Sequence, residues 1–155
     1  MMLSQLYPSL APILSATPIV GLYFASSWCP DCTPVTPKLK SIYESQGEEN
    51  QLEIVYISSD STADQFQNTF TDHHGSWSAV PYENTDELAG IKRHFGACAG
   101  KEMIGLGMKQ SDRKFGIPTL IIINARTEEV VSTEGLKDVE GLGIDALKKW
   151  EGLLE

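Results

Sequence analysis

An apolar run that ends at a pair of cysteines is the feature that most constrains how this chain can fold. Residues 18–25 read PIVGLYFA, and the run continues into SSWCPDC, which holds Cys29 and Cys32. Continuous β-branched and aromatic residues over this length are typical of a strand buried on both faces. Apolar residues then recur at helical spacing from Val35 to Tyr43. The two cysteines are therefore predicted to lie where a strand turns into a helix.

Three more strands are predicted along the chain. Residues 52–58 and 118–123 are also rich in β-branched residues, and a short polar turn joins 118–123 to a strand at 129–133. So short a connection implies an antiparallel hairpin, whereas the helix that follows 18–25 implies a crossover and parallel pairing. The order predicts an α/β fold with a mixed central sheet and helices on both faces.

The rest of the chain predicts three more helices and one long loop. Helical patterns begin at Ser61, run from Asn84 to the stop at Gly96, and close the chain from Val139 to Leu154. Between them the pattern dissolves over residues 97–114, where three glycines lie among apolar residues. With 155 residues in all, we expect a single domain, 1–155, with its core over 18–154 and an inserted loop over 97–114.

The charge balance argues against several classes of partner. Twelve basic and 21 acidic residues give a net charge of −9, and a negative surface repels nucleic acid and anionic lipid. No apolar run reaches the roughly 20 residues that span a bilayer, and the N-terminus lacks the basic segment of a signal peptide. We expect a monomeric protein of the cytoplasm, or of the nucleus, with no nucleic-acid or membrane partner.

The cysteines themselves favour redox chemistry. Three cysteines are too few, and odd in number, for a secreted disulfide framework. A zinc site would need a second close pair of ligands, and Cys98, His73, His74 and His94 do not form one. The chain also lacks a glycine-rich nucleotide fingerprint. We therefore expect neither a metal nor another cofactor, and a Cys29–Cys32 pair that opens and closes as a redox-active disulfide.

The predicted position of the pair assigns a role to each sulfur. Unpaired N–H groups at a helix N-terminus stabilise a thiolate, which is the nucleophilic form. Cys29, nearest the strand end, is expected to be the exposed attacking sulfur. Cys32, deeper in the helix, is expected to resolve the mixed disulfide.

Several spaced motifs resemble one known family. The segment from Tyr23 to Pro30, YFASSWCP, resembles the aromatic strand and active-site motif of the tryparedoxin and nucleoredoxin family, which has the thioredoxin fold. Further matches are Thr36-Pro37-Lys38-Leu39, Ser59-Asp60, Trp77 with Val80-Pro81-Tyr82, and Gly116-Ile117-Pro118-Thr119-Leu120. The resemblance extends over about residues 18–134.

The resemblance implies a thiol–disulfide oxidoreductase that reduces protein disulfides. An external reductant, either thioredoxin reductase, glutathione or another dithiol, would restore the dithiol. Pro118 would be a cis proline packed against the active-site disulfide, and Ile117 would present its backbone to a substrate peptide. Trp28 would cover the site, next to Pro30 and Asp31.

This sequence also departs from the family pattern. Asp31 replaces the family's second proline, and its charge is expected to raise the pKa of Cys29. Residues 97–114 form a longer loop than the family has. That loop ends just before Pro118, so it is expected to lie near the active face and to affect partner choice.

Two other functions remain open at this point. A thiol peroxidase would fit Ser26, but Leu22 stands where such enzymes carry a proline. A binding module that has kept the fold and lost turnover is also compatible with Asp31 and the long loop. Other residues have plainer interpretations: Trp77 and Tyr82 as groove or core residues, Cys98 as an unpaired thiol in a flexible loop, Trp150 as core, and Asp60 as a turn residue.

Overall fold

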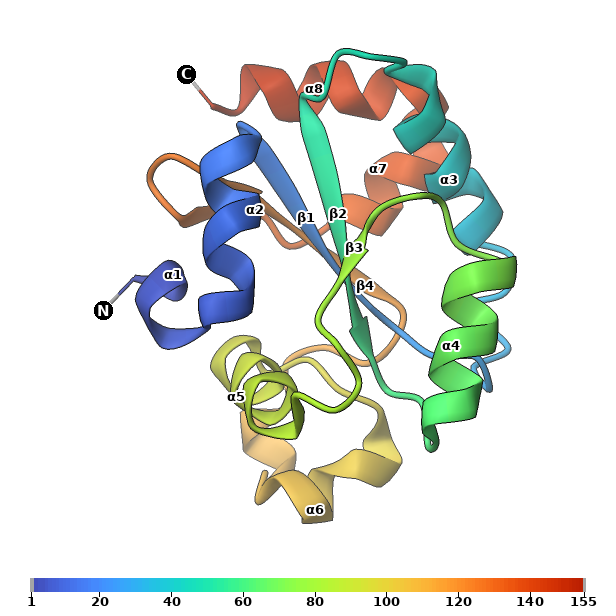
Figure 1. Ribbon diagram of the computed structural model, residues 1–155, viewed down its shortest axis with the longest axis vertical. Coiled ribbons are helices and arrows are strands. Elements are labelled where there is room, and N and C mark those ends of the chain that lie inside the picture. The colour runs from blue at the N-terminus through green and yellow to red at the C-terminus, as the bar shows by residue number, and fades with distance from the viewer. Residues whose placement is uncertain (1, 155) are drawn as a thin grey trace.

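A five-stranded mixed sheet lies at the centre of the computed structural model, which describes residues 2–154 (Figure 1). The strands are β1 (Ile19–Ala25), β2 (Leu52–Ser58), β3 (Ser78–Ala79), β4 (Thr119–Asn124) and β5 (Glu129–Ser132). Their order in the sheet is β3-β2-β1-β4-β5. The first three run parallel, and β4 is antiparallel to both of its neighbours. The predicted mixed α/β sheet is confirmed, with the short β3 as an edge strand that the sequence pattern did not indicate.

Helices cover both faces of this sheet. One layer holds α3 (Thr36–Ser45), α4 (Ala63–Asp72), α7 (Gly135–Leu142) and α8 (Ala146–Gly152), and the other holds α1 (Leu3–Leu6), α2 (Ala11–Ala16) and α5 (Thr85–Phe95). Alternate strand residues serve the two layers, as the two-residue period of a strand requires. Tyr23 and Tyr56 pack into the first layer, and Phe24 and Ile57 into the second. No helix within residues 2–154 is long and apolar enough to cross a bilayer.

The N-terminal residues form an additional cover for the second layer. Helix α1, the 3-10 turn η1 (Pro8–Leu10) and α2 bury Leu3, Leu10 and Leu14 against it. The Tyr7 hydroxyl donates to the carbonyl of Gly90 in α5 at 2.9 Å. The prolines of this stretch lie in the first turns of η1 and α2, where a missing N–H costs no hydrogen bond.

The closing helix is broken, and the prediction of one continuous apolar face over 139–154 is wrong. Gly143 has a φ of 56° and a ψ of −132°, which ends α7 and starts the 3-10 turn η4 (Gly143–Asp145) before α8. Leu142 and Leu153 are consequently exposed. Trp150 is fully buried, as predicted, and its indole N–H donates to Asp138 at 3.0 Å.

Residues 97–114, called the insertion below, are folded rather than a flexible loop. They form η2 (Gly100–Glu102), α6 (Met103–Leu106) and η3 (Gln110–Asp112). Cys98 is a free thiol, but it is fully buried and its Sγ lies 3.9 Å from the Met108 sulfur. Arg113 Nε donates to the Cys98 carbonyl at 3.0 Å. The insertion therefore has its own small core, and the prediction that Cys98 lies in a flexible loop is wrong.

The junction between α5 and the insertion depends on glycine at position 96. Gly96 has a φ of 67°, and a Cβ atom there would lie 2.7 Å from the carbonyl oxygen of Asp112. We expect Gly96→Ala to lower the free energy of unfolding by about 2–3 kcal/mol, because left-handed strain and a backbone clash add together. Gly47 is the matched control, since its φ is 61° but nothing lies within 4 Å of its Cβ position. Gly47→Ala should cost about 1 kcal/mol in urea unfolding, and equal losses for the two variants would contradict the clash.

Candidate active site

The cysteine pair lies in a series of turns between β1 and α3. Helix α3 begins at Thr36 rather than at the cysteines, so the prediction that Cys32 lies within the helix is wrong. Pro34 and Pro37 explain the delay, because neither has an N–H to donate to the carbonyl four residues earlier. Turn hydrogen bonds still form, from Cys32 N to the Cys29 carbonyl at 3.2 Å and from Thr36 N to the Cys32 carbonyl at 3.1 Å. Pro37 lies in the first turn of α3 and does not kink its interior.

Both sulfurs are free thiols and both are buried. Cys29 is 4% exposed and Cys32 is 2% exposed, so the prediction of an exposed Cys29 is wrong. The reason is a contact with a distant segment: Cys29 Sγ lies 4.0 Å from the carbonyl oxygen of Ile117. The Ile117–Pro118 bond is cis, as the resemblance implied. The Cys29 sulfur thus lies at the edge of the core, beside the start of β4.

The environment of Cys32 favours its thiol form. Burial raises the pKa of Cys32, and a hydrogen bond with Cys29 and the charge of Asp31 raise it further. The backbone of Ser26 acts in the opposite direction and lowers it. A thiol that must act as a nucleophile therefore needs help to lose its proton.

Asp60 fixes the loop that carries the cysteines. Its carboxylate accepts a hydrogen bond from the Ser27 amide at 2.7 Å, from the Tyr56 hydroxyl at 2.7 Å and from the Ser58 hydroxyl at 2.6 Å. Ser59, the next residue after β2, also holds the loop, because its carbonyl accepts a hydrogen bond from the Trp28 indole at 2.9 Å. Asp60 therefore does more than the turn role that its position suggested: it ties the end of β2 to the active-site loop.

The insertion packs directly against this loop. The Lys101 ammonium lies 3.9 Å from the centre of the Trp28 ring, a cation–π contact. Glu102 accepts from the Ser59 hydroxyl at 2.6 Å and pairs with Lys92 of α5 at 2.6 Å. The prediction that residues 97–114 approach the active face is confirmed. Trp28, at 37% exposure, remains the large apolar side chain that this face presents.

An aromatic cluster lies behind the cysteines. The Tyr23 hydroxyl shares a hydrogen bond of 2.7 Å with Thr36, whose hydroxyl also reaches the Cys32 carbonyl. The His74 ring lies 4.3 Å from the Tyr56 ring and accepts at Nδ1 from the Trp77 indole at 3.1 Å. Trp77 is thereby a core residue, and Tyr82 packs half-buried against the same core.

Burial of His74 makes stability depend on pH. Desolvation lowers the pKa of His74 from 6.5 to about 4. Between these pH values the unfolded chain therefore binds a proton at His74, whereas the folded chain keeps the ring neutral. Its contribution to stability is complete above pH 6.5 and is lost as the pH falls towards 4, by about 3 kcal/mol in all. Urea unfolding between these pH values should show this loss, and His74→Gln should remove it. An equal pH dependence in that variant would contradict the assignment.

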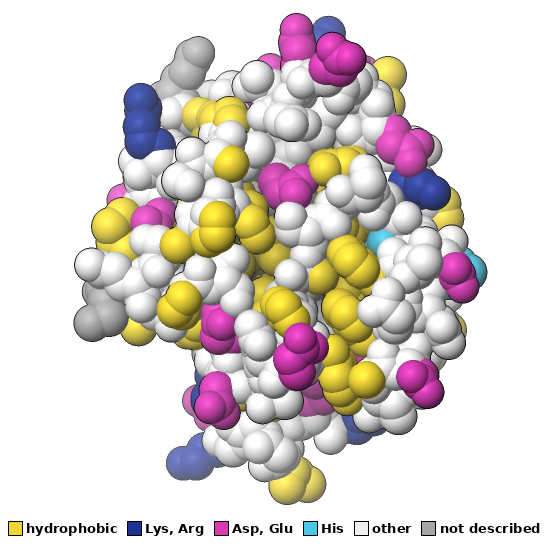
Figure 2. Space-filling model, viewed as in Figure 1, with side chains coloured by type: hydrophobic (Ala, Val, Ile, Leu, Met, Phe, Trp, Pro, Cys, Tyr) yellow, Lys and Arg dark blue, Asp and Glu magenta, His cyan; other side chains and the backbone are white. Residues whose placement is uncertain are grey.

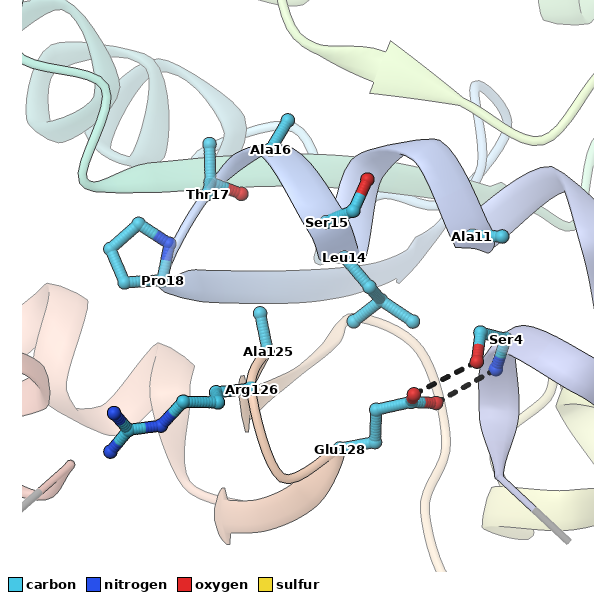
Figure 3. Close-up of a pocket in the computed structure, with 10 residues that line it drawn as sticks. All are labelled: Ser4, Ala11, Leu14, Ser15, Ala16, Thr17, Pro18, Ala125, Arg126 and Glu128. Atoms are coloured by element: carbon cyan, nitrogen blue, oxygen red, sulfur yellow. Dashed lines mark hydrogen bonds between the residues drawn. The ribbon is translucent and has the colours of Figure 1, made fainter.

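Two hollows of the surface lie away from the sulfurs. Figure 2 shows apolar side chains gathered over β3 between α2 and α4, among them Phe66, Phe70 and Pro81. A cavity of about 580 Å³ lies at the end of the sheet far from the cysteines, where β1 begins and β4 ends. Figure 3 shows the residues that line it. There Glu128 accepts from the amide and hydroxyl of Ser4 at 2.7 and 2.8 Å. Within residues 2–154, no three His, Cys, Asp or Glu side chains form a cluster able to hold a metal ion.

Comparison with known proteins agrees with this geometry. A model of the thioredoxin-like family matches residues 18–130, from the start of β1 to β5. The chain belongs to the thioredoxin-like family. This confirms the predicted thioredoxin fold and the resemblance to the thioredoxin-like proteins.

Two groups of thioredoxin-like relatives share much of the chain. Tryparedoxin from Trypanosoma brucei brucei is 32% identical over 117 residues, which are 74% of this chain and 67% of that protein. Nucleoredoxin from Bos taurus is 31% identical over 121 residues, which are 77% of this chain and 23% of that protein. The chain therefore spans about a quarter of nucleoredoxin.

Solved structures of a tryparedoxin and of a thioredoxin also superpose on this chain. Tryparedoxin from Trypanosoma brucei superposes with a TM-score of 0.68 and 28% identity, over 90% of this chain and 83% of that one. A thioredoxin from Wuchereria bancrofti superposes with a TM-score of 0.67 and 29% identity, over 92% and 86% of the two chains. The relatives are thiol oxidoreductases, so thiol–disulfide redox chemistry is the general activity that this membership supports.

Two residues at the site, His74 and Glu102, were not predicted from the sequence to contribute to it, because only the fold brings them beside the cysteines or their loop. Ser26 was considered only for a thiol peroxidase, and it lies beside Cys32 in the cavity lining. His74 was considered only as a metal ligand, and adjacent histidines give no other signal. Glu102 could have been suspected from its position in an apolar, glycine-rich insertion, where an acidic residue needs a partner if it is buried.

Proposed function

We propose that this protein reduces disulfides of protein substrates through a Cys29–Cys32 dithiol cycle. The observation that carries the proposal is the pair of free thiols, Cys29 and Cys32, with Cys29 beside the backbone of Ile117. Two cysteines two residues apart in one turn, with Cys32 N bonded to the Cys29 carbonyl, can close a disulfide with little backbone movement. Membership of a family of thiol oxidoreductases supports the same chemistry.

The cycle has two exchange steps. In the first, the Cys29 thiolate attacks one sulfur of the substrate disulfide, a Cys29–substrate disulfide forms, and the other substrate sulfur leaves as a thiolate. In the second, the Cys32 thiolate attacks Cys29 Sγ, which releases the second substrate thiolate and leaves the Cys29–Cys32 disulfide. Two electrons pass from the dithiol to the substrate. An external dithiol or reductase must return them before the next turnover.

The surroundings of Cys29 suit an extended polypeptide as substrate. The carbonyl of Ile117 lies beside Cys29 Sγ, and it can accept a hydrogen bond from a substrate strand. Trp28, the residue before Cys29, offers a partly exposed apolar surface that is held by Ser59 and contacted by Lys101. Because Cys29 is buried, substrate binding must move Trp28 or the Ile117–Pro118 turn slightly before attack.

The reductant is proposed by chemical class. Two molecules of glutathione, one molecule of a glutathione-derived dithiol or one turnover of a thioredoxin reductase would deliver the two electrons that reduce the disulfide. A solved structure of tryparedoxin II, 25% identical with a TM-score of 0.65, is a complex with glutathionylspermidine. That relative supports low-molecular-weight thiols as donors for this protein.

The test is reduction of insulin disulfides by the full chain, with glutathione or dithiothreitol as donor. We expect insulin precipitation to accelerate in proportion to enzyme, and the oxidised protein to contain one disulfide between Cys29 and Cys32. Peroxide consumption in place of insulin reduction would overturn the proposal in favour of a thiol peroxidase. An absence of both activities would leave the fold as a binding module.

A further inference from the structure

A cavity with hydroxyl and imidazole groups in its lining opens beside Cys32. It has a volume of about 220 Å³, and Cys32, Ser26, Thr36 and His74 are among its lining residues. A water molecule occupies about 30 Å³ of liquid, and a cavity lined by hydroxyl and imidazole groups is polar enough to hold several. The mechanism above uses Cys32 but none of this space.

Ser26 and His74 are among the hydrogen-bond donors of the cavity lining that have no acceptor in the described residues. Ser26 is 5% exposed, and its Oγ is the one fully enclosed side-chain oxygen or nitrogen of the described residues without a partner. His74 Nε2 has no partner among the described residues either, but it is not fully enclosed, and the ring lines this cavity. Buried polar groups are normally satisfied, so each such exception needs a reason.

Trp77 decides which form of His74 faces the cavity. An indole N–H can only donate, so its 3.1 Å hydrogen bond makes His74 Nδ1 an acceptor. The proton of the neutral imidazole therefore lies on Nε2. Burial keeps the ring neutral at neutral pH, because it lowers the pKa of His74 to about 4. His74 accordingly offers a neutral N–H donor to the space that Cys32 shares.

We propose that Ser26 and His74 act through cavity water to stabilise the Cys32 thiolate, and that the cavity carries the Cys32 proton to solvent. This inference rests on the dithiol cycle proposed above. Before the second exchange step, the S–H bond of Cys32 breaks and its proton passes to a cavity water. The electron pair stays on sulfur and then attacks Cys29 Sγ. The proton ends in bulk water or on the substrate thiolate that leaves, so no further reactant is needed. Ser26 and His74 are positioning residues in this scheme.

The other titratable groups around the cavity cannot take this role. The Tyr56 hydroxyl is engaged by Asp60 and the Tyr23 hydroxyl by Thr36, and burial raises the pKa of both tyrosines, so they keep their protons. The Asp60 carboxylate already accepts three hydrogen bonds. The charge of Asp31 raises the pKa of Cys32, which opposes thiolate formation.

His73 is the remaining titratable group of the lining. It is exposed at the end of α4, where solvent meets its imidazole. His74 is therefore the titratable group left to favour the Cys32 thiolate from inside the cavity, and Ser26 supplies the fully enclosed hydroxyl of the lining. Their identity makes the inference testable with conservative variants.

The experiment follows the reaction of the reduced full chain with the chromogenic disulfide DTNB. All variants carry Cys98→Ala, so that two thiols react. Attack by Cys29 releases the first nitrothiobenzoate, and attack by Cys32 on the mixed disulfide releases the second, which separates the two steps in one stopped-flow trace. We expect His74→Phe to slow the second release about tenfold at neutral pH and to move its pH midpoint up by about one unit, with the first release unchanged.

Two further variants guard against a structural explanation. His74→Gln keeps an acceptor for Trp77 and an N–H donor for the cavity, so it should restore most of the second rate. Ser26→Ala removes an oxygen without a partner, breaks no hydrogen bond, and should slow the second release about threefold. If Ser26→Ala and His74→Phe both leave the rate and the pH midpoint of the second release unchanged, the inference is overturned. Equal slowing of both releases would overturn it too.

DTNB needs no protein substrate, so this result does not depend on the substrate class. A chain that fails with insulin but shows the selective loss with DTNB would refute protein-disulfide reduction and retain the role of the cavity. If all three variants reduce insulin normally and give unaltered DTNB traces, the role of the cavity is refuted and protein-disulfide reduction is retained.

Discussion

Replacing Cys29 with serine should abolish disulfide reduction, whereas replacing Cys32 with serine should stop the cycle one step later. Without Cys29 no sulfur lies beside Ile117 to attack the substrate, and we expect insulin reduction to fall by about a thousandfold or more. Without Cys32 the first exchange still occurs, but nothing displaces the substrate. The Cys32→Ser protein should therefore accumulate as a covalent adduct with its substrate that an added thiol reverses.

Gel electrophoresis under non-reducing conditions, followed by mass spectrometry, measures the adduct and identifies the trapped partner. Cys98→Ala is the matched control, because Cys98 is fully buried within the insertion and should contribute nothing to turnover. Substantial turnover by Cys29→Ser, or an adduct formed by Cys29→Ser and not by Cys32→Ser, would reverse the proposed order of attack.

Glu102→Ala should be among the most destabilising single substitutions in this chain. The Lys92 side chain is 6% exposed and its ammonium lies 2.6 Å from Glu102, so removal of the carboxylate leaves a buried charge without a partner. Breaking a buried pair in this way costs about 3–5 kcal/mol. The same substitution removes the acceptor of the Ser59 hydroxyl and of the Ala99 amide. Chemical unfolding of the purified variant measures the loss.

A double variant separates the charge from the packing. Glu102→Ala combined with Lys92→Met removes both members of the pair, and apolar replacement of a whole buried pair is often close to neutral. We expect the double variant to regain much of the lost stability. A double variant no more stable than Glu102→Ala alone would mean that the hydrogen bonds of Glu102, rather than its charge, hold the insertion in place.

The sheet was predictable because its strands carry local patterns. Residues 18–25, 52–58 and 118–123 are long enough, and apolar enough, that burial on both faces was the simplest interpretation. The two residues of β3 are too short to show a period, and they form a strand only because β2 presents a free edge. The break at Gly143 was missed because the apolar spacing continues across it, and only the backbone reveals the change of direction.

The site was predictable in its residues and not in its environment. The spacing of Cys29 and Cys32 indicated redox chemistry, but the burial of Cys29 depends on Ile117, a residue far along the chain that the fold brings within 4.0 Å. Lys92 lies in the last turn of α5, where a basic residue is usually exposed, but here it is buried and paired with Glu102 of the insertion. His74 acquires its tautomer from Trp77 and its place behind Cys32 from the course of α4. Such properties arise from contacts between segments, which no local pattern contains.

The sealed thiol of the insertion gives this protein a natural reporter. Cys98 has no exposed surface, so an alkylating reagent can label it only when residues 97–114 open transiently. The fraction labelled over time thus measures the opening rate of the segment that touches Trp28, without any introduced probe. Substrate proteins that bind to that segment should slow the labelling of Cys98, so the labelling rate would also measure partner binding.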